Sequence, residues 1–63
     1  MDGDYLREYV GSIVKIELEN GFYYRGKILS VGEDSLLILD KTGRKVVVAF
    51  KVITTLEEEG SHW

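Results

Sequence analysis

The chain has 63 residues, a formal net charge of −3 and no cysteine. A chain of this length forms one small domain, which buries only about 60% of the surface that its unfolded chain exposes. Such a domain is marginally stable alone, and without cysteine neither a disulfide bond nor a cysteine-based zinc site can stabilise it. The one histidine, His62, cannot form a metal site by itself. We therefore expect no cofactor, and we expect the domain to gain stability by oligomerisation.

Composition also restricts the environment and the partners of the protein. The longest uninterrupted apolar runs have four or five residues, whereas a membrane-spanning helix needs about 20. The amino end has no signal-peptide pattern, so we expect a cytoplasmic protein that does not contact a membrane. Residues 5–56 hold eight Lys or Arg against six Asp or Glu. This mildly basic body is compatible with binding the phosphate backbone of a nucleic acid.

The first predicted element is a short helix over residues 4–10. Asp4 can serve as its N-cap, and Leu6 and Val10 lie four residues apart on one face. Gly11 can end the helix in the left-handed conformation. A helix of two turns is too short to stand alone, so it must pack against the rest of the domain.

Five strands are predicted after the helix. Apolar and charged residues alternate in "SIVKIEL", which is typical of a half-buried strand. The pair Asn20-Gly21 predicts a tight hairpin turn, because both positions can adopt positive φ. Further strands are predicted in "FYYRGKILSV", "SLLILD", "KVVVAF" and "VITTL". The single predicted domain covers residues 1–63, with the strands within residues 12–56 and an acidic C-terminal tail over residues 57–63.

Gly26 lies in the middle of the second predicted strand. A strand of about ten residues is long for a domain of this size, and glycine inside a strand marks a bend, a bulge or a close backbone approach. A bend at Gly26 would let the strand take part in both halves of a closed sheet. We therefore predict a mainly β fold, a strongly bent five-stranded antiparallel SH3-like small barrel. The alternative reading of Gly26 is close approach to a ligand.

Two of the predicted strands do not alternate. Residues 36–39 and 46–50 are apolar in succession, so both faces of each strand require burial. An exposed apolar edge strand also invites uncontrolled strand pairing. A closed ring of identical subunits, joined edge to edge, meets both requirements. The candidate interface residues are Val46, Val47, Val48, Ala49, Phe50, Val52, Ile53 and Thr54.

These residues resemble a known family over nearly the whole chain. The stretch "VKIELENGFYYRGKILSV", followed by "LLILD", resembles the first motif of the Sm and Sm-like (Lsm) proteins, and "VVVAFKVITTLEE" looks like their second motif. The segment "FKVITT" is also similar to a stretch of the bacterial RNA chaperone Hfq. The resemblance implies an Sm-like fold and a ring of six or seven subunits, in which the fourth strand of one subunit pairs with the fifth of the next. It also implies single-stranded RNA bound around the central pore.

The chain departs from the family pattern where the family binds RNA. Gly32, Ser35 and Leu36 stand where the resemblance leads us to expect an Asp and a Met-Asn pair, and Ala49-Phe50 stands in place of Arg-Gly. Phe50 could instead stack on a base, and Lys51 could meet a phosphate. Asp34 and Ser35 could hydrogen-bond to a base. The plainer readings are a core or interface role for Phe50, a solvated Lys51, and an ordinary turn at residues 32–35.

The second predicted strand carries a further set of candidates. Tyr23, Arg25 and Lys27 share one face and combine aromatic and basic groups, as nucleic-acid surfaces do. Tyr24 faces the other way, toward the predicted core. Tyr23 could equally pack on a neighbouring subunit.

Three functions remain open at this point. The leading hypothesis is a ring-forming Sm-like protein that binds single-stranded RNA at pore loops over residues 32–36 and 49–51, by base stacking and phosphate contacts. The alternative is an oligomeric scaffold of the same fold that joins other proteins and has lost RNA binding. The third is a monomeric SH3-like adaptor. We do not expect an enzyme, because no nucleophile, base and orienting group converge in the sequence.

Overall fold

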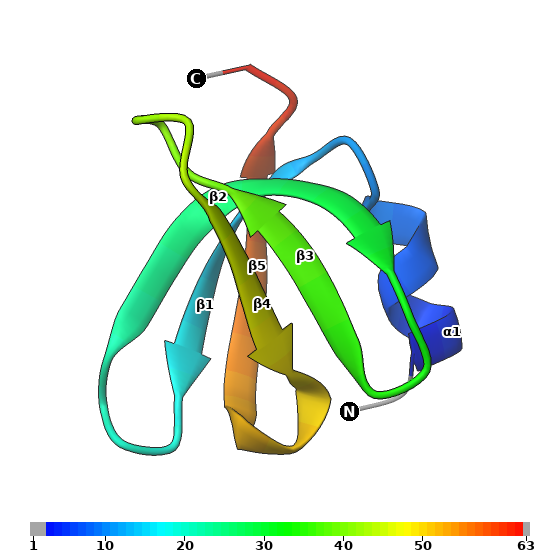
Figure 1. The fold of residues 1–63 in the computed structure, drawn as a ribbon, viewed down its shortest axis with the longest axis vertical. Helices are drawn as coiled ribbons and strands as arrows, with labels where there is room; N and C mark the ends of the chain where they lie inside the picture. The colour runs from blue at the N-terminus through cyan, green and yellow to red at the C-terminus, as the bar shows by residue number, and fades with distance from the viewer. Residues whose placement is uncertain (1–2, 63) are drawn as a thin grey trace.

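The computed structural model describes residues 3–62. Within these residues a helical turn is followed by five strands (Figure 1). The prediction of a mainly β domain with a short N-terminal helix is confirmed. In chain order the elements are α1 (Gly3–Leu6), the 3-10 helix η1 (Arg7–Tyr9), β1 (Ile13–Leu18), β2 (Tyr23–Val31), β3 (Ser35–Leu39), β4 (Lys45–Ala49), the 3-10 helix η2 (Phe50–Val52) and β5 (Ile53–Gly60).

The strands form one antiparallel sheet in the order β4-β3-β2-β1-β5. The central strand β2 has two halves with different partners. Residues 23–27 pair with β1, and residues 27–31 pair with β3. Figure 1 shows β2 arching over the molecule, so that β3 and β4 lie over β1 and β5. The sheet is open, since β4 and β5 each have a neighbouring strand on one side only within the described residues.

Gly26 lies at the bend of β2 and is buried. A Cβ atom added there would lie 2.6 Å from the carbonyl oxygen of Leu39 and would also overlap the side chain of Ile38. The arch therefore brings the backbone of β3 against Gly26 at a distance that only glycine permits. This close approach is to the chain's own third strand, so the bend explains the glycine without a ligand.

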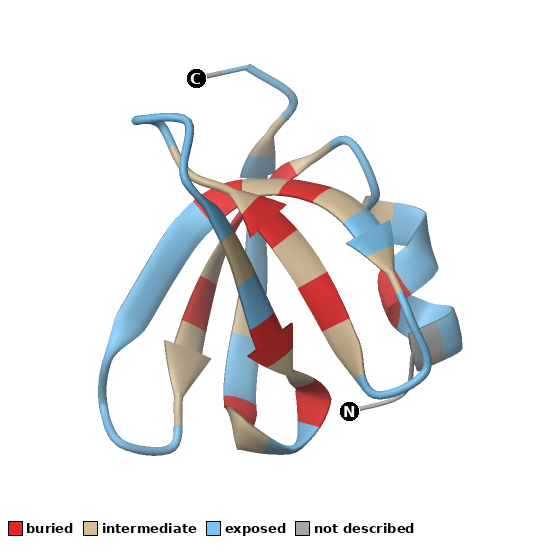
Figure 2. Cartoon of the chain, in the orientation of Figure 1, coloured by how far each residue is buried: buried red, intermediate tan, exposed pale blue. Residues whose placement is uncertain are grey.

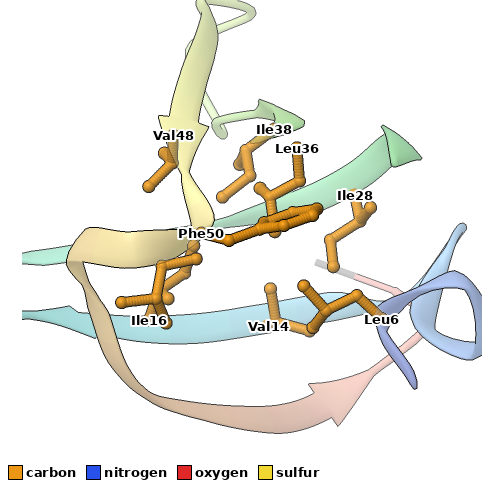
Figure 3. Packing of buried hydrophobic residues seen from close by; sticks show 9 residues of the cluster. Leu6, Val14, Ile16, Ile28, Leu36, Ile38, Val48 and Phe50 are labelled. Carbon is orange, nitrogen blue, oxygen red and sulfur yellow. The ribbon is translucent and has the colours of Figure 1, made fainter. Parts of the chain in front are cut away.

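The core fills the concave side of the arched sheet. Figure 2 shows buried and half-buried residues alternating along β3, as one-sided burial requires. Leu6 of α1 is 2% exposed and packs into the same cluster, which explains how so short a helix is held. The buried cluster, most of which is labelled in Figure 3, comprises Leu6, Val14, Ile16, Ile28, Leu36, Ile38, Val48, Phe50 and Ile53.

The convex face of β3 and β4 is apolar as well but is incompletely covered. Leu37 and Leu39 are half-buried, and Val47 is 68% exposed. We expected both faces of these strands to be buried. Within a single chain this expectation is wrong at Val47. One small sheet with one helical turn has enough atoms to cover only its concave side.

Two predicted boundaries are corrected by the structure. The expected helix over residues 4–10 is one α-helical turn and one 3-10 turn, and Asp4 lies inside the first turn, where it pairs with Arg7, instead of capping it. The acidic tail was expected to begin at residue 57, but β5 continues to Gly60. Trp63, at the end of that tail, lies outside the described residues. Within residues 3–62 no helix is long and apolar enough to cross a membrane.

The extension of β5 has identifiable causes. The strand pairs with β1 from Leu18↔Ile53 to Ile13↔Gly60. The hydroxyl of Ser12 donates to the Glu58 carboxylate at 2.7 Å, and Arg25 of β2 pairs with Glu59. Partners far away in sequence therefore hold three successive glutamates in a strand that their local composition does not favour.

Candidate nucleic-acid interface

One candidate site is a pocket between two loops. One side comes from the turn between β2 and β3, and the other from the end of β4 and the start of η2. We call it the loop pocket; its volume is about 540 Å³, and it is lined by Glu33, Asp34, Ser35, Ala49, Phe50 and Lys51. The two segments that the sequence predicts as RNA-binding loops therefore lie side by side.

Backbone hydrogen bonds hold the two sides of the loop pocket together. The N–H of Phe50 donates to the carbonyl oxygen of Asp34 at 2.9 Å, and that of Gly32 donates to the carbonyl oxygen of Ser35 at 2.8 Å. Ser35 also pairs with Ala49 in the register of β3 and β4. Because the backbone is fixed on both sides, the pocket is an integral part of the sheet end and not a gap between free loops.

Phe50 does not offer a stacking surface in this structure. The residue is 5% exposed, and Figure 3 shows its ring among the side chains of Leu36, Ile28 and Val14. The stacking role predicted for Phe50 is therefore replaced by the core role, which was the alternative. The spacing in the sequence could not decide this outcome, since residues 46–50 are apolar on both faces of the predicted strand.

The polar groups of the loop pocket are few and close to solvent. Glu33, Asp34 and Lys51 are exposed, and Ser35 is half-buried. The pocket thus presents an ammonium group, two carboxylates and a hydroxyl. An ammonium can bind phosphate, and the hydroxyl and carboxylate can donate to and accept from a base edge. The carboxylate of Glu33 repels phosphate. The sequence already predicts this repulsion, because Glu33 stands next to Asp34.

The other predicted RNA-binding residues lie on a different surface. Tyr23, which is 57% exposed, and Arg25 belong to the outer face of β2, beside β1 and β5. The Nζ atom of Lys15 lies 4.6 Å from the ring centroid of Tyr23, and Arg25 pairs with Glu59. These groups are engaged with their own sheet and do not line the loop pocket. Lys27, half-buried farther along β2, does not line it either.

The outer face of β1, β2 and β5 carries a smaller polar hollow. It has a volume of about 160 Å³ and is lined by Lys15, Glu17, Tyr23, Thr55 and Glu57. Tyr24, expected in the core, is 39% exposed near the hairpin between β1 and β2. Among the described residues no group of three or more acidic or histidine side chains could hold a metal ion.

The predicted interface residues divide into two groups. Val48, Phe50 and Ile53 are buried in the core of their own chain. Val46, Val47 and Ala49 lie along β4, and Thr54 is exposed on β5, where its hydroxyl donates to the Glu17 carbonyl oxygen at 3.0 Å. Val52, which is half-buried, lies in η2 between the two strands. The residues of the second group therefore lie on β4 and β5, the two edge strands of the sheet, and on η2 between them.

Comparison with protein-family models gave no match, and comparison with curated proteins gave no significant match. Function must therefore be inferred from the loop pocket and from the two edges of the sheet.

Proposed function

We propose that this chain is an Sm-like protein that assembles with copies of itself into a ring and binds single-stranded RNA in the loop pocket. The observation that carries the proposal is the pocket itself, in which Asp34 and Ser35 face Phe50 and Lys51 across the end of the sheet. The bent five-stranded sheet supports the same reading. In this proposal the fold is an SH3-like small barrel, the ring has six or seven subunits and the protein acts in the cytoplasm.

RNA binding in this pocket would depend on polar contacts. The hydroxyl of Ser35 would donate to a base carbonyl oxygen, and the carboxylate of Asp34 would accept a base N–H. The ammonium of Lys51 would neutralise a phosphate. With the Phe50 ring buried, each pocket lacks the stacking that strengthens most single-strand binding. Each subunit would therefore bind weakly, and useful affinity would come from repeated pockets around one assembly.

Self-assembly follows from the two sheet edges. An unpaired edge such as β4, with its run of valines, is a template for another strand. Pairing β4 of one subunit with β5 of the next uses two different surfaces, and such a head-to-tail contact closes into a ring or continues as a filament. The exposed Val47 would be covered in either product.

A second candidate function is an oligomeric scaffold that no longer binds RNA. Glu33 and Asp34 favour it, because two carboxylates beside the pocket's lysine repel phosphate. In this case the loop pocket or the outer face would contact another protein.

Titration of fluorescently labelled oligo-U and oligo-A at two salt concentrations separates these functions. The RNA proposal predicts binding that weakens as salt rises. Lys51→Gln should weaken it further, whereas Lys41→Gln, which changes an exposed lysine outside the pocket, should leave it nearly unchanged. Absence of binding at low salt by an intact oligomer would favour the scaffold. A native mass equal to that of one chain would exclude both functions and favour a monomeric adaptor.

A further inference from the structure

The two open edges of the sheet differ in charge. β4 begins with a basic residue, Lys45, and continues with valines. β5 has Thr55 and Leu56 at its middle and Glu57 to Glu59 toward its end. In an antiparallel pair the start of one strand lies beside the end of the other. The basic end of β4 would therefore lie beside the acidic end of β5 from another copy.

We propose that β4 of one copy and β5 of another pair in a single register, with Lys45 opposite Glu57. Leu56 then lies opposite Val46, and Thr55 lies opposite Val47. The proposal rests on the self-assembly in the proposed function, and it adds the register and the charge pair that sets it.

The inward and outward faces of the two strands restrict the possible registers. On β4, Val48 is buried in the core and Val47 is exposed, so Lys45 and Val47 share the outer face. On β5, Leu56 pairs with Ile16, which is fully buried, so Leu56 points inward. Thr55 and Glu57 then point outward, where both line the outer polar hollow. A continuous sheet keeps inner residues beside inner residues, so alternative registers differ by two residues.

Neighbouring registers match the side chains less well. A shift of two residues in one direction places Lys45 opposite Glu59, but it also places Val46 opposite Glu58 and Val47 opposite Glu57. Both valines would then lie beside carboxylates, one of which already accepts from Ser12. A shift in the other direction places Lys45 opposite Thr55 and leaves Glu57 beyond the start of β4. The proposed register alone combines a charge pair with an apolar pair and a Val–Thr pair.

Other pairings of the same edges are less complete. Two β4 strands could pair about a twofold axis with Val47 opposite Val47, but both β5 edges would then stay open. Two β5 strands paired antiparallel would place the glutamates of each beside the uncharged start of the other, with no basic partner, and both β4 edges would then stay open. Pairing β4 with β5 uses both edges of every copy. It also places Glu57 between Lys45 of the neighbour and its own sheet partner, Lys15.

Cysteine cross-linking tests the register, since the natural chain has no cysteine. Residues opposite each other in an antiparallel pair have Cβ atoms about 4.5–5.5 Å apart, within reach of a disulfide after small adjustment. The double variant Val47→Cys/Thr55→Cys should form a ladder of covalent dimers and larger species on mild oxidation. The matched variant Val47→Cys/Glu57→Cys, which reports a shift of two residues, should form much less. All three positions are exposed, so these variants should fold.

Each outcome of the cross-linking has a defined meaning. A stronger ladder from Val47→Cys/Glu57→Cys would overturn the register while leaving self-assembly intact. Disulfide dimers of the single variant Val47→Cys would indicate pairing of two β4 strands and would also overturn it. Unmodified protein with the mass of one chain would overturn the proposed assembly and the register together.

Charge reversal supplies an independent measurement of the same pair. Lys45→Glu or Glu57→Lys alone should weaken subunit association by about five-fold or more per contact, because each places like charges together. The double variant Lys45→Glu/Glu57→Lys should recover most of the loss. Lys41→Glu, which changes the same charge in the turn before β4, is the control. Losses in the double variant that equal the sum of the single losses would overturn the charge pair.

Discussion

Gly26→Ala is expected to destabilise the fold by crowding the bend of β2. The added methyl carbon would lie 2.6 Å from the Leu39 carbonyl oxygen, well inside normal contact, and it would also overlap Ile38. Ile38 can adjust its side chain, but the carbonyl belongs to the backbone of β3 and can move only if the paired strands separate. Overpacking of this kind costs about 1–3 kcal/mol. The smaller unfolded-state entropy of alanine offsets about 0.4–1 kcal/mol of that cost.

Denaturant unfolding at one fixed protein concentration would measure the effect, since the stability of an oligomer depends on concentration. Gly32→Ala is the matched control. Gly32 has no positive φ, and a Cβ there would meet only the Ser35 carbonyl oxygen at 3.4 Å. We expect Gly32→Ala to change the free energy of unfolding by less than about 0.5 kcal/mol. Equal stability of the two variants would refute the close backbone approach as the reason for Gly26.

Three further predictions concern the turn between β3 and β4, the core and the loop pocket. The hydrogen bond from the Thr42 hydroxyl, followed by the backbone N–H of Arg44, holds the pKa of Asp40 below its ordinary 3.8. Because the folded pKa is the lower one, this carboxylate stabilises the fold above about pH 4 and loses that effect as pH falls through the folded pKa. Asp40→Ala should therefore lower the thermal midpoint more at pH 7 than at pH 2; equal lowering at both would contradict this. Phe50→Ala should lower the free energy of unfolding by about 3–5 kcal/mol in denaturant titration, as loss of a buried ring does, and a loss below about 1 kcal/mol would contradict its core role. Glu33→Gln should raise oligo-U affinity by up to about five-fold at low salt and less at high salt, and unchanged affinity would mean that RNA does not pass the loop pocket.

The features that could be predicted from sequence are those with local causes. Alternation in residues 13–18 predicts β1, because burial on one face imposes a period of two. The hairpin at residues 20–21 was predicted, and Gly21 has a φ of 87°, but Asn20 lacks the positive φ that the predicted two-residue Asn-Gly turn requires. The two loops of the candidate site could also be predicted, since both follow from where strands end.

The features that were missed depend on contacts between distant residues. Glu58 and Glu59 are strand residues because Ser12 and Arg25 bind them, and neither partner is near them in sequence. The direction of the Phe50 ring was left open because the strand before it is apolar on both faces. Only the arch of β2 decides which face of β4 is covered, and it leaves Val47 outside.

Assembly and RNA binding should be linked through β4. The loop pocket lies at the C-terminal end of this strand, at Ala49 to Lys51, whereas the proposed charge pair lies at its start, at Lys45. Antiparallel pairing then sets the pocket of one copy beside the start of β5 of the next, so each added copy repeats the pocket at a fixed interval. Lys45→Glu should therefore reduce binding of a long oligo-U although Lys45 does not line the pocket. It should leave binding of a short oligomer that fills a single pocket unchanged, because only the longer strand gains from neighbouring copies. Equal losses for both lengths would mean that Lys45 contacts RNA directly and that the two functions of β4 are independent.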